Sequence, residues 1–171
     1  LMFWAAREVT LLARRFVSNW MAIAAGAIAI SVPWVIVAGS MAYNEAPLIG
    51  LLAVCWRLVD LGPRAMRWFV LIGFLTGVAC GAKLTAVGGV VAPIGVLLLI
   101  RVEPRRWWKM IVGCSLGGLI ALAPYLIRNF AALDGANPLF PFLANWLGSA
   151  HWSAEQVERW NKAHGPHEPW L

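Results

Sequence analysis

Three charged side chains stand inside or beside long apolar stretches of this sequence: Glu45, Lys83 and Arg128. Charges held at or below a membrane surface are costly and are candidates for function by default. A lysine and an arginine together can hold an anionic group through charge-assisted hydrogen bonds. A carboxylate near them can orient or activate a hydroxyl, or bind a metal. These residue types therefore predict a site for an anionic ligand.

Each of the three residues also has a purely structural interpretation. Glu45 could be a first-turn acid that the helix dipole favours. Lys83 could be a lysine that snorkels from a helix end, and Arg128 could be an interface anchor. The structural interpretation is weakest for Lys83, because the turn that contains it is expected to lie below the membrane surface.

The elements that must position these residues are apolar helices. Of the 171 residues, 61% are hydrophobic and 13% are charged, whereas a soluble domain carries about 25% charged residues. A membrane span needs about 20 apolar residues to cross roughly 30 Å of hydrocarbon. The composition therefore predicts an all-α fold, a polytopic transmembrane helical bundle. Charge-free runs cover residues 16–44, 68–82, 84–100 and 110–127.

The basic residues fall in short groups between the apolar runs, so the net charge of +6 does not indicate a nucleic-acid partner. Grouping of this kind is typical of cytoplasmic loops under the positive-inside rule. Ten of the 14 Lys and Arg residues belong to three groups, which are Arg7, Arg14 and Arg15; Arg57, Arg64 and Arg67; and Arg101, Arg105, Arg106 and Lys109.

The charge-poor segment 68–100 is either one over-long helix or two short helices that meet at Lys83. A single crossing would carry the third basic group to the outside, against the positive-inside rule. Two short crossings return that group to the cytoplasm. We therefore predict two, with Lys83 in a turn at the outer edge of the bilayer.

With this choice, the sequence predicts about five spans. The first is expected to kink at Pro33, and Arg57 is expected to snorkel from the end of the second. The three cysteines, Cys55, Cys80 and Cys114, lie in apolar runs and are interpreted as small buried hydrophobes. The spans are residues 17–43, 48–61, the two arms of 68–100, and 110–127.

We expect residues 1–142 to form the transmembrane domain and residues 143–171 to begin an external, amphipathic region. Ser153 and Gln156 have the spacing of a capping box, so residues 153–163 should form a short surface helix at the membrane interface. The histidines, His151, His164 and His167, lack the spacing of metal ligands and are interpreted as surface residues.

The sequence carries local patterns at residues 42–47, 77–85, 124–129 and 135–142. Together they resemble those of bacterial integral-membrane glycosyltransferases of the GT-C class. The branch most similar contains protein O-mannosyltransferases and lipid A aminoarabinose transferases. The chain departs from it in two ways: Gly135-Ala136-Asn137-Pro138 is one residue longer than the usual motif, and the first external loop with its catalytic acid is absent. We therefore expect an internal piece of a longer protein.

The resemblance implies transfer of a sugar from a polyprenyl phosphate to a lipid, glycan or protein hydroxyl, in the bacterial inner membrane. Glu45 would help shape the acceptor site or a divalent metal site, and Lys83 and Arg128 would hold the donor phosphate. A transporter or flippase for an anionic lipid is the alternative, because it too requires a broken helix and a cation, and a non-catalytic membrane scaffold is the third interpretation. The substrate site would also be lined by Tyr43, Asn44, Asn129 and Asn137.

Overall fold

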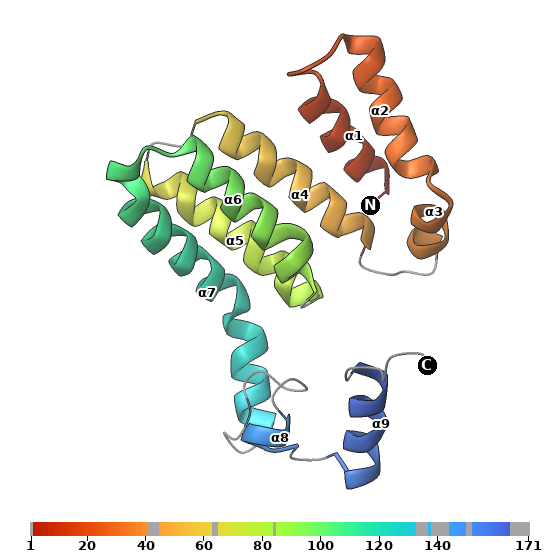
Figure 1. Cartoon of the computed structure of the whole chain (residues 1–171), viewed down its shortest axis with the longest axis vertical. Coiled ribbons are helices and arrows are strands. Elements are labelled where there is room, and N and C mark those ends of the chain that lie inside the picture. Colours follow the sequence, from red (N-terminus) through yellow and green to blue (C-terminus); the bar gives the residue numbers. More distant parts are fainter. Residues whose placement is uncertain are drawn as a thin grey trace, which may run out of the picture. The chain divides into compact units, whose positions relative to one another are not determined.

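The computed structural model describes residues 2–40, 45–62, 65–83, 85–132, 137, 144–149 and 152–164. Within these ranges, all regular secondary structure is helical, which confirms the predicted all-α class (Figure 1). The helices are α1 (Met2–Ala13), α2 (Asn19–Ser31), α3 (Pro33–Ser40), α4 (Glu45–Asp60), α5 (Met66–Ala82), the π-helix η1 (Val87–Val91), α6 (Ala92–Arg101), the 3-10 helix η2 (Pro104–Arg106), α7 (Trp107–Ala132), α8 (Ala144–Leu147) and α9 (Ala154–His164).

The helices belong to two compact units, Leu1–Leu122 and Ala123–Leu171. In the first unit, α4 contacts α1, α3, α5 and α6, and Figure 1 shows α4, α5 and α6 running side by side. The predicted boundary between residues 142 and 143 separates membrane from external residues, and it stays a prediction.

Two apolar clusters hold α4, α5 and α6 together, one toward each end of these helices. Burial of such side chains contributes about 25 cal/mol per Å² of apolar surface. Toward the start of α4 the buried residues are Leu51, Ala79, Cys80, Ala86 and Val90. Toward its end they are Cys55, Val59, Phe69, Ile72, Ile94, Leu98, Val102 and Met110.

Glycines let α5 and the first part of α7 approach closely. A Cβ added at Gly77 would lie 2.8 Å from the Cβ of Ala121 and 2.9 Å from the carbonyl oxygen of Gly118. A Cβ added at Gly113 would lie 2.6 Å from the Cβ of Phe69. Small residues at helix contacts are typical of bundles in lipid, where dispersion contacts replace the hydrophobic driving force.

Pro33 divides the predicted first span. The sequence predicted one kinked helix over residues 17–43, but the structure forms α2 and α3, with the non-helical residue Val32 between them. Pro33 is the first residue of α3, a position where its missing N–H would have no helical partner. The last predicted span, 110–127, also ends later than expected, because α7 continues to Ala132 with Pro124 inside it.

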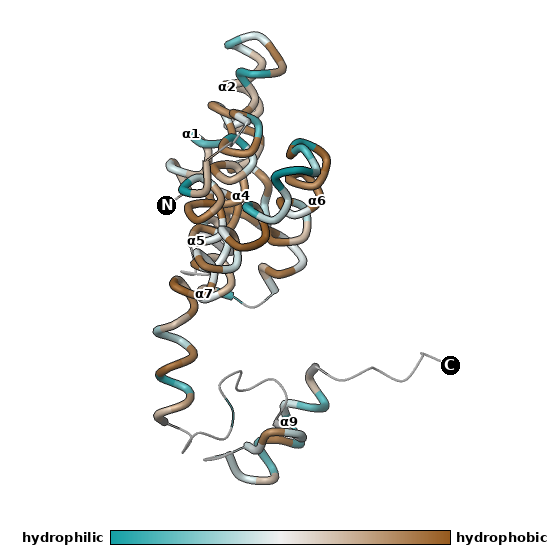
Figure 2. Tube along the Cα trace, turned by 90° about the vertical axis from the view of Figure 1, so that its left-hand side faces the viewer, coloured by the Kyte–Doolittle hydropathy of each residue, from teal (hydrophilic) through white to brown (hydrophobic). Residues whose placement is uncertain are grey.

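One described helix, Pro104–Ala131, is long and apolar enough to cross a membrane, with a mean hydropathy of 2.0 over its best window. Of that window, 17% is buried within the chain. Figure 2 shows hydrophobic colouring along much of α7. Shorter apolar helices cover Asn19–Ser31, Met66–Ala82 and Val87–Arg101. At 1.5 Å per residue, the 17 residues of α5 extend about 25 Å.

In the second unit, α9 begins with the predicted capping box. The backbone N–H of Ser153 donates to Oε1 of Gln156 at 2.8 Å, and the N–H of Gln156 donates to Oγ of Ser153 at 3.3 Å. Because the two hydrogen bonds satisfy backbone donors at the helix start, the helix begins where the sequence predicted. Its last residue is His164 rather than Ala163.

Candidate functional site

The apolar segment 68–100 breaks at Lys83, as the sequence predicted. Lys83 has an extended backbone, with φ −158° and ψ 119°. Its N–H still donates to the carbonyl oxygen of Ala79 at 3.0 Å, and its own carbonyl accepts from the N–H of Ala86 at 2.9 Å. The chain then returns through the π-helix η1 into α6. The two arms therefore form a helical hairpin with Lys83 at its turn.

The local sequence favours a break at this point. Gly81, Gly88 and Gly89 flank the turn, and a Cβ at any of them would meet no atom within 4 Å. These glycines are therefore not needed for close packing, and they lower the helix propensity around Lys83. The carbonyl oxygen of Thr85 accepts from the N–H groups of both Gly88 and Gly89, at 3.1 and 3.2 Å. The helix therefore restarts with irregular geometry, which is frequent at functional sites.

The start of α4 lies at the same end of the first unit as Lys83. Leu51 of α4 belongs to one cluster with Ala79 and Cys80 of α5 and with Ala86 and Val90 beyond the turn. Glu45 is the first residue of α4, as predicted, although the orientation of its side chain lies outside the described part of the chain. Tyr43 and Asn44 also lie outside the described residues. The fold thus brings the backbone of Glu45 and the Lys83 turn to one end.

The remaining predicted site residues belong to the second unit. Arg128 is exposed on α7 rather than at the helix exit, and the adjacent Asn129 is buried. Asn137 is fully buried, and its Nδ2 donates to the carbonyl oxygen of Gly148 at 3.2 Å. Gly148 has a φ of +95°, a conformation that favours glycine. Asn137 therefore has a structural contact, and the gathering of Arg128 with Lys83 stays a prediction.

At the opposite end of α4, the structure shows an ion-pair cluster that sequence reasoning missed. The carboxylate of Asp60 forms ion pairs with Nε of Arg15 at 2.9 Å and with Nη2 of Arg101 at 3.3 Å. Asp60 therefore pairs with one arginine of the first basic group and one of the third. In sequence, Asp60 itself lies within the second basic group. The positive-inside prediction requires the basic groups to lie at one end of the helices, and these ion pairs are consistent with that requirement.

A second ion pair lies deeper along α4. Oε2 of Glu8 is 3.0 Å from Nη2 of Arg57, and Glu8 is only 3% exposed. Oε2 accepts no hydrogen bond of good geometry, so this contact is mainly coulombic. Arg7 contacts the other carboxylate oxygen. Arg57 therefore pairs with a buried acid, whereas the sequence predicted a snorkelling side chain.

A signal for both acids was present in the sequence. Glu8 follows Arg7 directly, and Asp60 stands three residues after Arg57. An acid inside a basic group at the end of an apolar run is more costly alone than paired, because lipid or protein surrounds it. Such acids indicate interhelical partners, although the sequence does not say which arginine each one meets.

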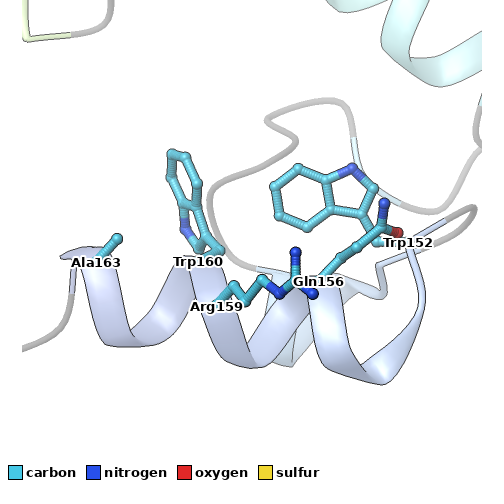
Figure 3. A pocket seen from close by; sticks show the side chains of 5 residues that line it. All are labelled: Trp152, Gln156, Arg159, Trp160 and Ala163. Atoms are coloured by element: carbon cyan, nitrogen blue, oxygen red, sulfur yellow. The ribbon is translucent and has the colours of Figure 1, made fainter.

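In the second unit, two tryptophans form a shallow pocket on α9. The ring centroids of Trp152 and Trp160 are 5.7 Å apart in an edge-to-face arrangement. Gln156, Arg159 and Ala163 line the same pocket, and Figure 3 shows both rings rising from one side of the helix. Glu155–Arg159 and Glu158–Lys162 pair along the helix. The face has the aromatic and charged composition of an interfacial helix.

The predicted cysteines are free thiols, with Cys55 and Cys80 buried and Cys114 partly buried. Among the described residues, no group of three His, Cys, Asp or Glu side chains could hold a metal ion. Comparison of the chain with models of protein families, with curated proteins and with solved structures finds no match. The resemblance to GT-C glycosyltransferases therefore stays a prediction from local patterns.

Proposed function

We propose that this chain is part of a multi-pass glycosyltransferase of the bacterial inner membrane. It would cross the membrane about five times and transfer a sugar from a polyprenyl-phosphate donor to a lipid, glycan or protein hydroxyl at the outer face. The observation that carries the proposal is the break at Lys83, a cation at the turn of an apolar helical hairpin.

The break has a physical cost that a ligand site would explain. Non-helical backbone at membrane depth is tolerated only where protein buries it or water reaches it. Because α5 extends only about 25 Å, its Lys83 end would lie below a surface about 30 Å from the other face. A cation at that depth is a candidate for function, with an anionic group as the partner that it would bind. The phosphate of a polyprenyl donor is such a partner, and its lipid tail would place it there.

The roles of the other residues follow from this placement. Lys83 and Arg128 would hold the donor phosphate and stabilise the charge that develops on the leaving group. Glu45, which begins α4 at the same end as Lys83, would shape the acceptor site or bind a divalent metal. Tyr43, Asn44, Asn129 and Asn137 would line the substrate site. A general base would come from an acidic loop outside this chain.

Donor binding by a Lys83→Met variant tests the proposal. The loss of one charge-assisted contact, about 1.5 to 3 kcal/mol, would weaken donor binding roughly 10-fold to 100-fold. Lys109→Met, which removes a lysine that contacts Trp108 near the opposite end of the hairpin, serves as the matched control. Unchanged donor affinity in folded Lys83→Met would contradict the phosphate role.

Turnover of a Glu45→Gln variant separates a catalytic role from a capping role. A helix cap alone would cost no more than about 1 kcal/mol of stability and leave turnover nearly intact. A residue that serves the site would lower turnover by about 100-fold or more in a protein that still folds and inserts.

Transport of an anionic lipid is the second candidate, because the same broken helix favours it. The two functions differ in their product. With labelled polyprenyl-phosphate sugar in liposomes, a transferase forms a new glycosidic product. A transporter moves the intact donor between leaflets and leaves its sugar bond unbroken.

A further inference from the structure

An apolar pocket lies at the connection between α4 and α5, far along these helices from Lys83. Leu58, Leu61, Gly62 and Trp68 line it, and its volume is about 270 Å³. Gly62 has a φ of +74° and donates its N–H to the carbonyl oxygen of Val59 at 3.0 Å, so the chain turns sharply beneath the pocket. Pockets that enclose whole small molecules measure about 300 to 1,000 Å³. This one has room for part of a longer apolar molecule.

The pocket opens on the outside of the bundle rather than toward its core. Leu61 is 65% exposed and Trp68 is 37% exposed within the chain, whereas the neighbouring Val59 and Phe69 are fully buried. In a helical bundle that crosses a membrane, acyl chains surround this outer surface. The apolar part of a bound molecule is therefore expected to be an acyl chain.

A cation stands at the edge of the pocket. The guanidinium carbon of Arg67 lies 5.7 Å from the ring centroid of Trp68, a cation–π distance. Arg67 is exposed, and it has no carboxylate partner among the residues that the structure describes. Its charge is thus available to an anionic group just outside the apolar pocket.

The acid nearest to the pocket in sequence is already neutralised by arginines. Asp60 precedes Leu61 in the chain, and its carboxylate already pairs with Arg15 at 2.9 Å and Arg101 at 3.3 Å. Two arginines against one carboxylate leave one positive charge, to which Arg67 adds a second. The surroundings of the pocket are therefore net positive.

We propose that this pocket binds an anionic phospholipid, with the phosphate on Arg67 and one acyl chain along Leu58, Leu61 and Trp68. Basic pockets between helices on the cytoplasmic side are a known way of recognising anionic head groups. The inference rests on the membrane placement within the proposed function, but not on sugar transfer. It predicts a lipid site at the opposite end from Lys83.

Native mass spectrometry of the full chain in neutral detergent tests this site. Dioleoyl phosphatidylglycerol should stay bound, while dioleoyl phosphatidylcholine, with the same acyl chains, should not. Arg67→Gln should lower phosphatidylglycerol affinity about 10-fold to 100-fold, as the loss of a charge-assisted contact predicts. Arg105→Gln removes the same charge from an exposed position in η2 and should leave the affinity nearly unchanged. Equal losses in both variants would overturn the site in favour of general charge attraction.

A second variant tests the apolar half of the pocket. Leu61→Gln should weaken phosphatidylglycerol binding about fivefold, because Leu61 is only partly covered and loses part of its transfer free energy. Inorganic phosphate and glycerol phosphate should bind neither variant nor wild type at the concentration where the lipid binds. Binding of free phosphate as tight as that of the lipid would contradict an acyl-chain pocket. Unreactive Cys55 reports that each variant is folded, since this thiol is fully buried.

The proposal of a lipid site and the proposal of a donor site can be contradicted independently of each other. Lys83→Met should leave phosphatidylglycerol affinity unchanged, since Lys83 lies at the other end of the helices. If Lys83→Met lowered phosphatidylglycerol affinity as much as Arg67→Gln, the site at Arg67 would be wrong. If phosphatidylglycerol binds as described and no sugar transfer is found, only the proposed function fails.

Discussion

The buried carboxylate of Glu8 makes a strong prediction about stability. Its only close charged neighbours among the described residues are Arg57, at 3.0 Å, and Arg7. Replacing one partner of a buried ion pair leaves an uncompensated charge, at a cost of about 3 to 5 kcal/mol. Arg57 is 30% exposed, and the exposed Arg7 would remain. We therefore expect Arg57→Met to lower the free energy of unfolding by about 2 to 3 kcal/mol, somewhat below the range for a fully buried pair.

The partner variants decide whether the pair itself is responsible. Removing both charges, in Glu8→Leu with Arg57→Met, should restore wild-type stability or exceed it, because a well-packed apolar replacement avoids the desolvation of both groups. Arg105→Met removes an exposed arginine and should change little. The sign of the difference between the single and double variants is the central result.

Thermal unfolding in detergent, followed with a thiol-reactive dye, measures these effects. Cys55 lies on α4 just before Arg57 and is fully buried in the apolar cluster that joins α4 to α5 and α6, so it reacts when the packing around α4 opens. A loss of 2 to 3 kcal/mol corresponds to a fall of about 4 to 12 °C in the unfolding midpoint for a chain of this size. A single variant as stable as wild type, or a double variant no more stable than the single one, would refute the reasoning.

Three further predictions concern packing, topology and charge. Gly77→Ala should destabilise the chain by about 1 to 3 kcal/mol through overpacking, since its Cβ would lie 2.8 Å from Ala121; Gly88→Ala, where no atom lies within 4 Å, should be neutral or stabilising in the same thermal assay. In a background without native cysteines, Arg105→Cys should react with an impermeant thiol reagent only from the cytoplasm and Gly135→Cys only from outside; labelling of both from one side would contradict the hairpin topology. The hydrogen bond from Lys162 lowers the pKa of Glu158, so this carboxylate's contribution to stability is present above its ordinary pKa and is lost as pH falls through the lowered value. Lys162→Gln should return the pKa to its ordinary range in an NMR titration, and an unchanged pKa would contradict the pairing.

The helical class, the break at Lys83 and the start of α9 followed from local sequence alone, whereas the first predicted span divided at Pro33 and α7 ran past its predicted end. Long charge-free runs favour helices because every backbone group is satisfied within the segment. The break at Lys83 was predictable because glycines surround a charge in an over-long apolar run, and the start of α9 because Ser153 and Gln156 satisfy its first backbone donors. These features depend on residues within a few turns of one another.

Only the tertiary structure decided which charges meet. Glu8 pairs with Arg57, and Asp60 joins Arg15 to Arg101, because α1, α4 and α6 pack side by side and bring distant residues to equal depth. A sequence gives the charge of each side chain but not the rotation of each helix about its axis, which the apolar contacts fix. For the same reason, the sequence placed Arg57 in the head groups, while packing against α1 placed it beside a buried carboxylate.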